Sequence, residues 1–287
     1  MSIGKKIKSL RNAKMMTQSE LAGSEITRNM LSRIENEAAQ PSLDTIRYLA
    51  ARLNVSPSYL LADGDDEYMY IKHKEINDIK RAYLSGEFHI CRDMCLNSSV
   101  PEDDEIKLIL AESTLEMAIE AFNRGALKAA CTLFDECIEA CSQTIYETGT
   151  FVAKAGAYFR YMNCISGSLT SEIIDEGEAF VLPALGDAFC SYALKLCEDE
   201  YSGIPIKRER EDIFANHLQA AEYIEASNFK SAYELLRLII TSQEVVPEPM
   251  LYFVYSDYEQ CCKETGDFKG AYEYSIARTE LFQKLLS

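Results

Sequence analysis

The chain has few of the residues that enzymes use for chemistry near neutral pH. Its three histidines, His73, His89 and His217, are far apart in the sequence. Neither a glycine-rich phosphate loop nor a nucleophile elbow is present. Carboxylates are numerous only because the chain is acidic overall. The sequence therefore predicts no enzyme activity, no catalytic residues and no cofactor.

Long apolar runs are also missing. No window approaches the roughly 18 consecutive apolar residues that a membrane span requires. The N-terminal residues lack an apolar segment followed by a small-residue cleavage site. We therefore expect a cytoplasmic protein, and 287 residues that are 47% hydrophobic suffice for two domains with their own cores.

Cysteine is absent from the first 90 residues and occurs ten times after them, inside apolar helical patterns. Zinc sites favour paired Cys-x-x-Cys or His/Cys knuckles, and the chain has none. The alternative metal reading would use His89, Cys91 and Cys95, or the spacing from Cys137 to Cys141. We expect reduced, packed thiols and no metal site.

Positive charge is scarce over most of the chain. The formal net charge is −17, yet residues 1–62 hold nine basic and five acidic side chains, a balance of +4. The remaining residues carry −21, the difference between these two values. A mildly basic N-terminal part on an acidic body suits a protein that touches phosphates with one end only, because DNA repels the body.

Helix signals dominate the basic part. Residues 2–14 have apolar side chains at helical spacing and predict a first helix. Thr17 and Glu20 have the spacing of a capping box for a second helix, which Gly23 ends. Thr27 is the expected N-cap of a third helix.

The third helix is expected to have an apolar face and a polar face. Leu31 and Ile34 are predicted to face the core. A short helix with polar side chains on its other side is what the DNA major groove admits. Arginine and asparagine make paired hydrogen bonds to guanine and adenine edges. We therefore predict a DNA-binding face, with a solvated polar face as the alternative, formed by Arg28, Asn29, Ser32 and Arg33.

Two further groups are expected around this helix. Gln18, Thr27 and Asn36 lie at helix ends, where phosphate contacts fix register without reading sequence. Arg11 and Glu35 are interpreted differently, as an internal ion pair that ties the first helix to the third.

Residues 1–62 as a whole resemble one known family. Ser42 predicts the start of a fourth helix, and Ser56 with Pro57 predicts a fifth. With its segments TQSELA, ITRNMLSRIEN, PSLDTIRYLAARLNVS and SPSYLL, this part resembles the Cro/phage-repressor (XRE) helix-turn-helix family over essentially its full length. The turn at residues 23–25 is one residue shorter than usual in that family. The resemblance implies binding to double-stranded DNA.

The rest of the chain is expected to be all helix. A polar hinge at residues 62–67 separates two predicted domains, a helix-turn-helix domain over 1–64 and a helical repeat domain over 65–287. Four stretches of the second domain share one template: a small residue, a spacer, a large apolar residue, two spacers and a small residue. They begin at Gly86, Gly125, Ser227 and Gly266, with separations of 39, 102 and 39 residues.

This template predicts a tight turn between two closely packed helices. The long gap leaves room for a further, irregular helical pair between about residues 148 and 200. The pattern resembles tetratricopeptide repeats, with Phe134, Tyr223 and Pro247 or Pro249 near other consensus places. Tryptophan, common early in those repeats, is absent. The resemblance implies an all-α fold in which the helix-turn-helix domain precedes a right-handed superhelix of helical hairpins.

The concave side of such a superhelix usually binds an extended peptide or a partner helix. Asparagine side chains can hydrogen-bond a peptide backbone of any sequence. We therefore predict peptide binding by Asn163, Asn216 and Tyr223, with surface or inter-repeat packing as the alternative. The amphipathic segment 272–286 is expected either to cap the superhelix or to form a dimer interface.

The order of the two domains is similar to that of bacterial peptide-pheromone receptors of the Rgg and PlcR type, the RRNPP group. That resemblance implies a homodimeric transcription regulator whose repeat domain senses a short peptide. Two alternatives stay open. One is a scaffold in which the repeats bind a partner protein, and the other is a repressor that needs no ligand.

Overall fold

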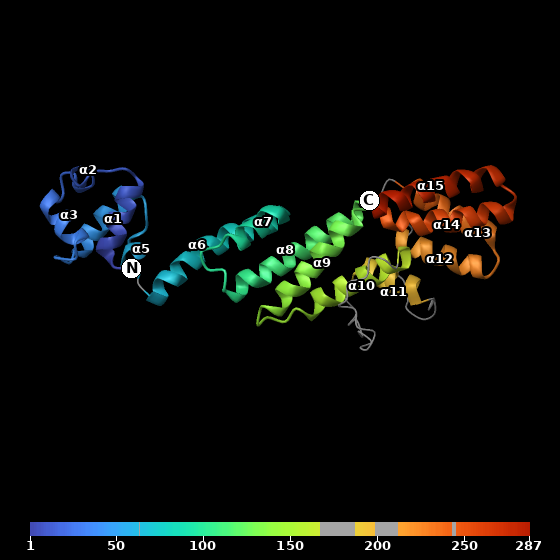
Figure 1. Ribbon diagram of the computed structural model, residues 1–287, viewed down its shortest axis with the longest axis horizontal. Helices are drawn as coiled ribbons and strands as arrows, with labels where there is room; N and C mark the ends of the chain where they lie inside the picture. Colours follow the sequence, from blue (N-terminus) through green and yellow to red (C-terminus); the bar gives the residue numbers. More distant parts are fainter. Residues whose placement is uncertain (63, 167–186, 199–211, 243–244) are drawn as a thin grey trace. The chain divides into compact units, whose positions relative to one another are not determined.

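The computed structural model describes all residues except 63, 167–186, 199–211 and 243–244 (Figure 1). The described residues form fifteen helices and no strand, which confirms the predicted all-α fold class. The first five helices are α1 (Ile3–Ala13), α2 (Gln18–Ala22), α3 (Arg28–Glu35), α4 (Leu43–Leu53) and α5 (Pro57–Leu61). The others are α6 (Gly64–Leu84), α7 (Phe88–Leu96), α8 (Asp104–Asn123), α9 (Leu127–Ser142), α10 (Gly149–Ile165), α11 (Ala188–Glu198), α12 (Ile213–Glu225), α13 (Phe229–Ile240), α14 (Glu248–Thr265) and α15 (Phe268–Leu286).

The chain folds as two compact units. One comprises Met1–Arg81 with Asn97–Pro101, and the other comprises Ala82–Leu96 with Glu102–Ser287. The domain boundary at residues 64 and 65 stays a prediction. The polar hinge is shorter than predicted, because α6 begins at Gly64 and residue 63 lies outside the described residues.

Four of the five helices of the N-terminal part, α2 to α5, begin where their capping residues predict. The Thr17 hydroxyl accepts from the backbone N–H of Glu20, whose carboxylate accepts from the Thr17 N–H, so the capping box is present. The hydroxyls of Thr27, Ser42 and Ser56 each accept from the backbone N–H of the third residue of α3, α4 and α5, without the reciprocal bond. These bonds satisfy N–H groups that a helix start leaves without an intrahelical partner.

A small apolar core holds the five helices together. Its fully buried members come from every helix of the group: Ile7, Leu21, Leu31, Ile34, Leu49, Leu53 and Leu60. Lys6 is buried as well, and its ammonium group donates to the backbone oxygens of Tyr59 and Ala62. The Nζ atom also lies 5.0 Å from the centre of the Tyr59 ring. Lys6 therefore ties α1 to the end of α5.

The repeat template marks four turns of the same conformation. Gly86, Gly125, Ser227 and Gly266 all have left-handed backbones, with φ of +73°, +77°, +56° and +83°. In each turn the next residue donates its N–H to a carbonyl five residues back, at 2.7 to 3.0 Å. The small template residues Cys91, Ala130, Ala232 and Ala271 are buried. This confirms the four predicted turns. Three of them close the hairpins α8/α9, α12/α13 and α14/α15, and the fourth precedes α7, which packs on α8.

Two helices, α10 and α11, occupy the predicted irregular gap (Figure 1). They are not an antiparallel hairpin. Lys154 pairs with Asp187 at 3.1 Å, and Tyr161 pairs with Tyr192 at 3.3 Å. Residue numbers therefore rise together along both helices, so α10 and α11 run in the same direction. The segment that joins them lies outside the described residues.

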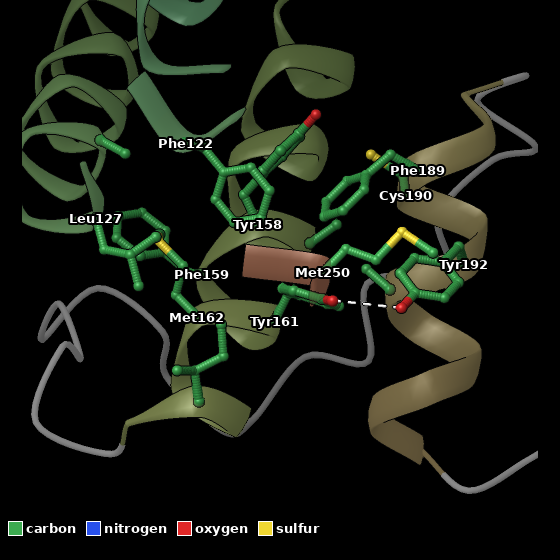
Figure 2. Packing of buried hydrophobic residues seen from close by; sticks show 14 of the residues in the cluster. Phe122, Leu127, Tyr158, Phe159, Tyr161, Met162, Phe189, Cys190, Tyr192 and Met250 are labelled. Atoms are coloured by element: carbon green, nitrogen blue, oxygen red, sulfur yellow. Dashed lines mark hydrogen bonds between the residues drawn. The ribbon is translucent and has the colours of Figure 1, made fainter. Parts of the chain in front are cut away.

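The core of the second unit is aromatic where α8, α10 and α11 meet (Figure 2). The Phe122 ring packs edge-on against Tyr158, and the Tyr158 and Phe189 rings stack with centres 4.4 Å apart. Aromatic pairs of this kind add about 0.5–1.5 kcal/mol beyond the area that they bury. These rings hold α11 against α10 and α8.

A chain of polar side chains runs through the same core. The hydroxyls of Tyr161 and Tyr192 are 3.3 Å apart, and a dashed line in Figure 2 marks this hydrogen bond. Nδ1 of the fully buried His217 lies 2.6 Å from the Tyr192 hydroxyl, and its Nε2 lies 3.1 Å from Asp257 Oδ2. This chain joins α10, α11, α12 and α14, and it satisfies polar groups that would be costly to bury alone.

One cysteine corrects part of the prediction, and the last helix is only partly covered by the rest of the unit. Seven thiols are buried and Cys131 and Cys197 are half-buried, whereas Cys164 is exposed, so the prediction of packed thiols is wrong for Cys164. In α15, Leu285 is buried and Tyr274, Leu281 and Phe282 pack against the core, while three apolar residues stay exposed. These three lie one helical turn apart on one stripe: Phe268, Tyr272 and Ile276.

Candidate nucleic-acid interface

Helix α3 has the two faces that its sequence predicts. Leu31, Ile34 and Glu35 are buried. Arg28, Asn29 and Arg33 are exposed, and Ser32 is half-buried on the same side. The spacing of these four positions places them together on the helix surface opposite the core. The structure thus brings together the predicted groove-facing residues as one exposed polar face.

An internal ion pair fixes α3 against α1, as predicted. Nε of Arg11 lies 2.7 Å from Glu35 Oε1, and Nη2 lies 3.0 Å from Glu35 Oε2. The Arg11 side chain is 11% exposed and that of Glu35 is 1% exposed. Burial raises the pKa of Glu35, but hydrogen bonds from Arg11 and Gln18 outweigh burial and leave this pKa below its usual value.

Gln18 belongs to the same internal hydrogen-bond network. Its Nε2 atom donates to Glu35 Oε2 at 2.8 Å, so its amide nitrogen bonds inside the domain. Thr27 is exposed and its hydroxyl caps α3 by accepting from the Met30 N–H at 3.1 Å. Asn36 is exposed and follows α3 directly. A phosphate role for Gln18, Thr27 and Asn36 stays a prediction.

The turn between α2 and α3 is braced from α4 by two residues that sequence reasoning missed. The Tyr48 hydroxyl donates to the Ala22 carbonyl at 2.9 Å, and Arg52 Nη2 donates to the Glu20 carbonyl at 2.6 Å. The Arg52 guanidinium also lies 5.6 Å from the centre of the Tyr48 ring. These bonds satisfy the last carbonyls of α2 and fix the start of the short turn. An aromatic residue and an arginine four positions apart on one helix were the available signal.

The basic residues of the first unit are not all available to an anion. Lys6 is buried, and Arg11 is paired with Glu35. The exposed cations of residues 1–62 are Lys5, Lys8, Lys14, Arg28, Arg33, Arg47 and Arg52. Lys5 has a loose partner in Glu37, at 3.8 Å.

The predicted peptide-binding residues do not share one helix. Asn216 and Tyr223 lie two turns apart on α12, and both are half-buried. Asn163 lies on α10, and its Oδ1 atom is buried without a hydrogen bond to any part of the chain that the structure describes. A buried acceptor without a partner costs about 1–3 kcal/mol.

Near the start of α12 is a pocket of about 410 Å³ that sequence reasoning missed. Its lining includes aromatic rings from three helices, Tyr158, Phe189 and Phe214. Asn123 and Asp212 also line it, and Asp212 caps α12. Its residues come from positions 123 to 247, so no local pattern announced it.

The described residues hold neither a metal-binding cluster nor a membrane-spanning helix. No three His, Cys, Asp or Glu side chains there are placed to hold a metal ion. No described helix is both long enough and apolar enough to cross a membrane.

Comparison with known proteins agrees with the N-terminal geometry. Residues 7–60 match the family model described as helix-turn-helix. This part of the chain is a helix-turn-helix domain. The match confirms the prediction for residues 1–62, and it leaves the remainder of the chain outside the matched family. No curated protein matches the sequence.

Two solved structures show similarity along most of the chain. One is a crystal structure of Bacillus thuringiensis PlcR in complex with the peptide PapR7 and DNA, with 14% identity, a TM-score of 0.25, and coverage of 99% of this chain and 96% of that one. The other is the apo form of the competence regulator ComR from Streptococcus vestibularis, with 19% identity, a TM-score of 0.20, and coverage of 97% and 91%. TM-scores of this size do not establish a common arrangement of the whole chains.

Proposed function

We propose that the protein is a sequence-specific DNA-binding transcription regulator whose helical repeats dimerise and bind a short peptide. One observation carries the DNA-binding part. Arg28, Asn29 and Arg33 form an exposed polar face on a short helix whose opposite face is locked into the core. A rigid helix with side chains suited to base edges is the element that helix-turn-helix proteins place in the major groove.

Arg28 and Arg33 are the proposed base-reading residues, and a substitution in each separates base contacts from phosphate contacts. The target sequence is first selected from randomised duplex DNA with the full-length chain. Arg28→Ala and Arg33→Ala should each weaken binding to that target by about 5- to 150-fold, because a bidentate base contact supplies about 1–3 kcal/mol of discrimination. Binding to random DNA should fall much less.

Arg47→Ala is the matched control, because Arg47 is also exposed but lies on α4 with Asp44 3.9 Å away. It should reduce affinity for the two DNAs by similar factors or not at all. Equal losses on both DNAs for Arg28→Ala and Arg33→Ala would reassign them to phosphate contact. If selection enriches no sequence, the proposal of sequence-specific binding is wrong.

Dimerisation is proposed to use the exposed stripe on α15. Phe268, Tyr272 and Ile276 are 74%, 69% and 41% exposed, and a second copy of the chain would cover them. Helix-turn-helix proteins commonly bind two half-sites one turn apart as dimers, which gives the stripe a function. Tyr272→Glu should shift the mass in sedimentation from dimer to monomer, whereas Glu273→Gln, at the adjacent exposed position, should not.

Peptide binding is proposed at the aromatic pocket by α12 and along Asn216 and Asn163. The pocket volume of about 410 Å³ suits one or two apolar side chains rather than a whole peptide. The backbone of the same peptide would bond to the asparagines, and Asn163 Oδ1 is already buried without a protein donor among the described residues.

A library of short randomised peptides can test this part without knowledge of the natural ligand. Peptides selected on the full-length chain should carry a shared apolar residue and should lose affinity for Phe214→Ala and for Asn216→Ala. They should also change the affinity of the chain for its selected DNA. A library that enriches nothing, or peptides bound equally by both variants, would contradict the assignment while leaving the DNA-binding proposal intact.

A further inference from the structure

We propose that Cys164 and Cys197 are a site of reversible oxidation and form a disulfide within one chain. Their Sγ atoms lie 2.8 Å apart, on α10 and α11. A disulfide requires about 2.05 Å between the sulfurs. The two atoms therefore need to approach by less than about 1 Å, which side-chain rotation supplies without separating the helices.

No other cysteine pair in the chain is placed as well for this reaction. Two further pairs, Cys91 with Cys95 and Cys137 with Cys141, are each four residues apart on one helix and are buried. Such helix positions keep their Cβ atoms about 5–6 Å apart, whereas a disulfide requires about 3.5–4.5 Å.

Cys261 and Cys262 are the remaining cysteines that lie close in sequence, and both are fully buried in α14. Adjacent helical residues point in different directions, so these two thiols do not face each other. Cys164 and Cys197 differ from all of these, because they lie on different helices, on sides that face each other.

Access also distinguishes the pair. Cys164 is the exposed thiol of the chain and Cys197 is half-buried, so a small oxidant such as hydrogen peroxide reaches them first. The Cys164 thiolate attacks the peroxide, takes one oxygen as a sulfenic acid and releases hydroxide. The Cys197 thiolate then attacks that sulfur, forms the S–S bond and releases a second hydroxide. In total two thiols lose two protons and two electrons, and one peroxide becomes two waters. A dithiol such as dithiothreitol reverses the reaction by exchange.

The position of the pair gives the disulfide a structural consequence. Cys164 and Cys197 lie near the C-terminal ends of α10 and α11, which run in the same direction. Tyr161, which begins the buried polar chain through Tyr192 to His217, lies one turn before Cys164 on α10. The disulfide would therefore fasten α10 to α11 beside the interactions that hold the middle of the second unit. It needs neither DNA nor peptide, so it is independent of the proposed function.

Counting thiols by mass gives a direct test on the full-length protein. The reduced chain, denatured and alkylated, should carry ten labels, and the chain treated with one equivalent of hydrogen peroxide should carry eight. Dithiothreitol should restore ten. The oxidised chain should run as a monomer on a non-reducing denaturing gel and should unfold at a higher temperature than the reduced chain.

Trypsin should release the crosslink as residues 161–195 joined to residues 196–207. Because the first peptide also contains Cys190, fragmentation of the crosslinked pair must place the bond at Cys164. Cys164→Ser should keep nine labels with and without peroxide. Cys197→Ser should carry nine labels before peroxide and lose at most one after it, as the Cys164 sulfenic acid, and should form no crosslink. The matched control Cys190→Ala should still lose two labels.

Ten labels after peroxide treatment would overturn the proposal. A crosslink at Cys190 or at any other pair would do the same, as would a disulfide that joins two chains on the gel.

Discussion

Glu35 offers the sharpest test of how the DNA-binding helix is held, because its carboxylate binds α3 to both α1 and α2. It accepts two hydrogen bonds from Arg11 and one from Gln18, and its side chain is 1% exposed. Glu35→Ala removes all three bonds and leaves the Arg11 guanidinium inside the domain with the Met16 carbonyl, 2.8 Å from Nη1, as its remaining acceptor among these contacts.

The magnitude follows from the burial of the two partners. Removing one member of a buried ion pair costs about 3–5 kcal/mol, because the other charge is left buried. Arg11 is 11% exposed and can reach water in part, so we expect the low end, about 3 kcal/mol. This corresponds to a roughly 100-fold increase in the population of the opened domain. Replacing both residues by apolar ones, as in Arg11→Met with Glu35→Leu, should cost much less, because no charge remains buried.

The lowered pKa of Glu35 also makes the stability of the folded domain depend on pH, in a direction that can be derived. The pKa of Glu35 is lower in the folded state than the value of about 4.3 expected in the unfolded chain. The unfolded state therefore binds the proton more tightly. The stabilisation is fully present above about pH 4.3 and is lost as the pH falls through the folded-state pKa. Glu35→Gln should remove this part of the acid sensitivity.

Hydrogen exchange on the full-length chain measures both effects locally. Amides of α3 should lose protection by roughly 100-fold in Glu35→Ala, while amides of α12 to α14 keep theirs. The double substitution should recover most of the protection. If Glu35→Ala reduces the protection of the α3 amides by less than about fivefold, the ion pair does not anchor α3. The same follows if the double substitution destabilises the domain by the sum of the two single substitutions.

Three further substitutions test packing elsewhere. Ser227→Gly should stabilise the protein by about 1 kcal/mol in urea unfolding, because Ser227 is held at φ +56° in a turn where the other three repeats have glycine. Gly4→Ala should cost about 1–3 kcal/mol in the same assay, since a Cβ at Gly4 would meet the Ile34 carbonyl oxygen where α1 packs on α3. His217→Phe should lower the thermal midpoint, because it removes a buried hydrogen-bond partner from both Tyr192 and Asp257, at a cost of about 1–3 kcal/mol.

Local signals predicted the parts of the structure that depend on neighbouring residues. The capping box at Thr17 and the caps at Thr27, Ser42 and Ser56 need only residues within one helical turn, and all four are confirmed. The repeat turns were predicted for the same reason. The pairing of Arg11 with Glu35 was predicted too, because an opposite charge pair between apolar helices has few other ways to be buried.

Contacts between residues far apart in sequence could not be read in this way. Lys6 counted as one of the basic residues, yet it is buried and bonds to the end of α5. Gln18 was predicted to contact phosphate, which stays a prediction, and the bond from its amide nitrogen to Glu35 was not foreseen. His217 was one of three scattered histidines until the fold placed it between Tyr192 and Asp257. A polar side chain can hydrogen-bond either to water or to a group inside the protein. Tertiary packing decides which of the two it contacts.

In the middle of the second unit, side-chain contacts hold together two helices that do not form a hairpin. Hairpins such as α8/α9 are held in part by their connection, because a left-handed residue such as Gly125 lets the chain reverse at once. Helices α10 and α11 run in the same direction, so no short turn can join them, and their pairing must come from side chains.

Three side-chain contacts hold α10 against α11 at successive positions along the two helices. Lys154 meets Asp187 at 3.1 Å, Tyr161 meets Tyr192 at 3.3 Å, and the sulfurs of Cys164 and Cys197 lie 2.8 Å apart. The ion pair responds to salt and the thiol pair to oxidant, whereas the hydrogen bond between the two buried tyrosines is shielded from both. The packing of α10 on α11 should therefore depend on salt and on oxidant.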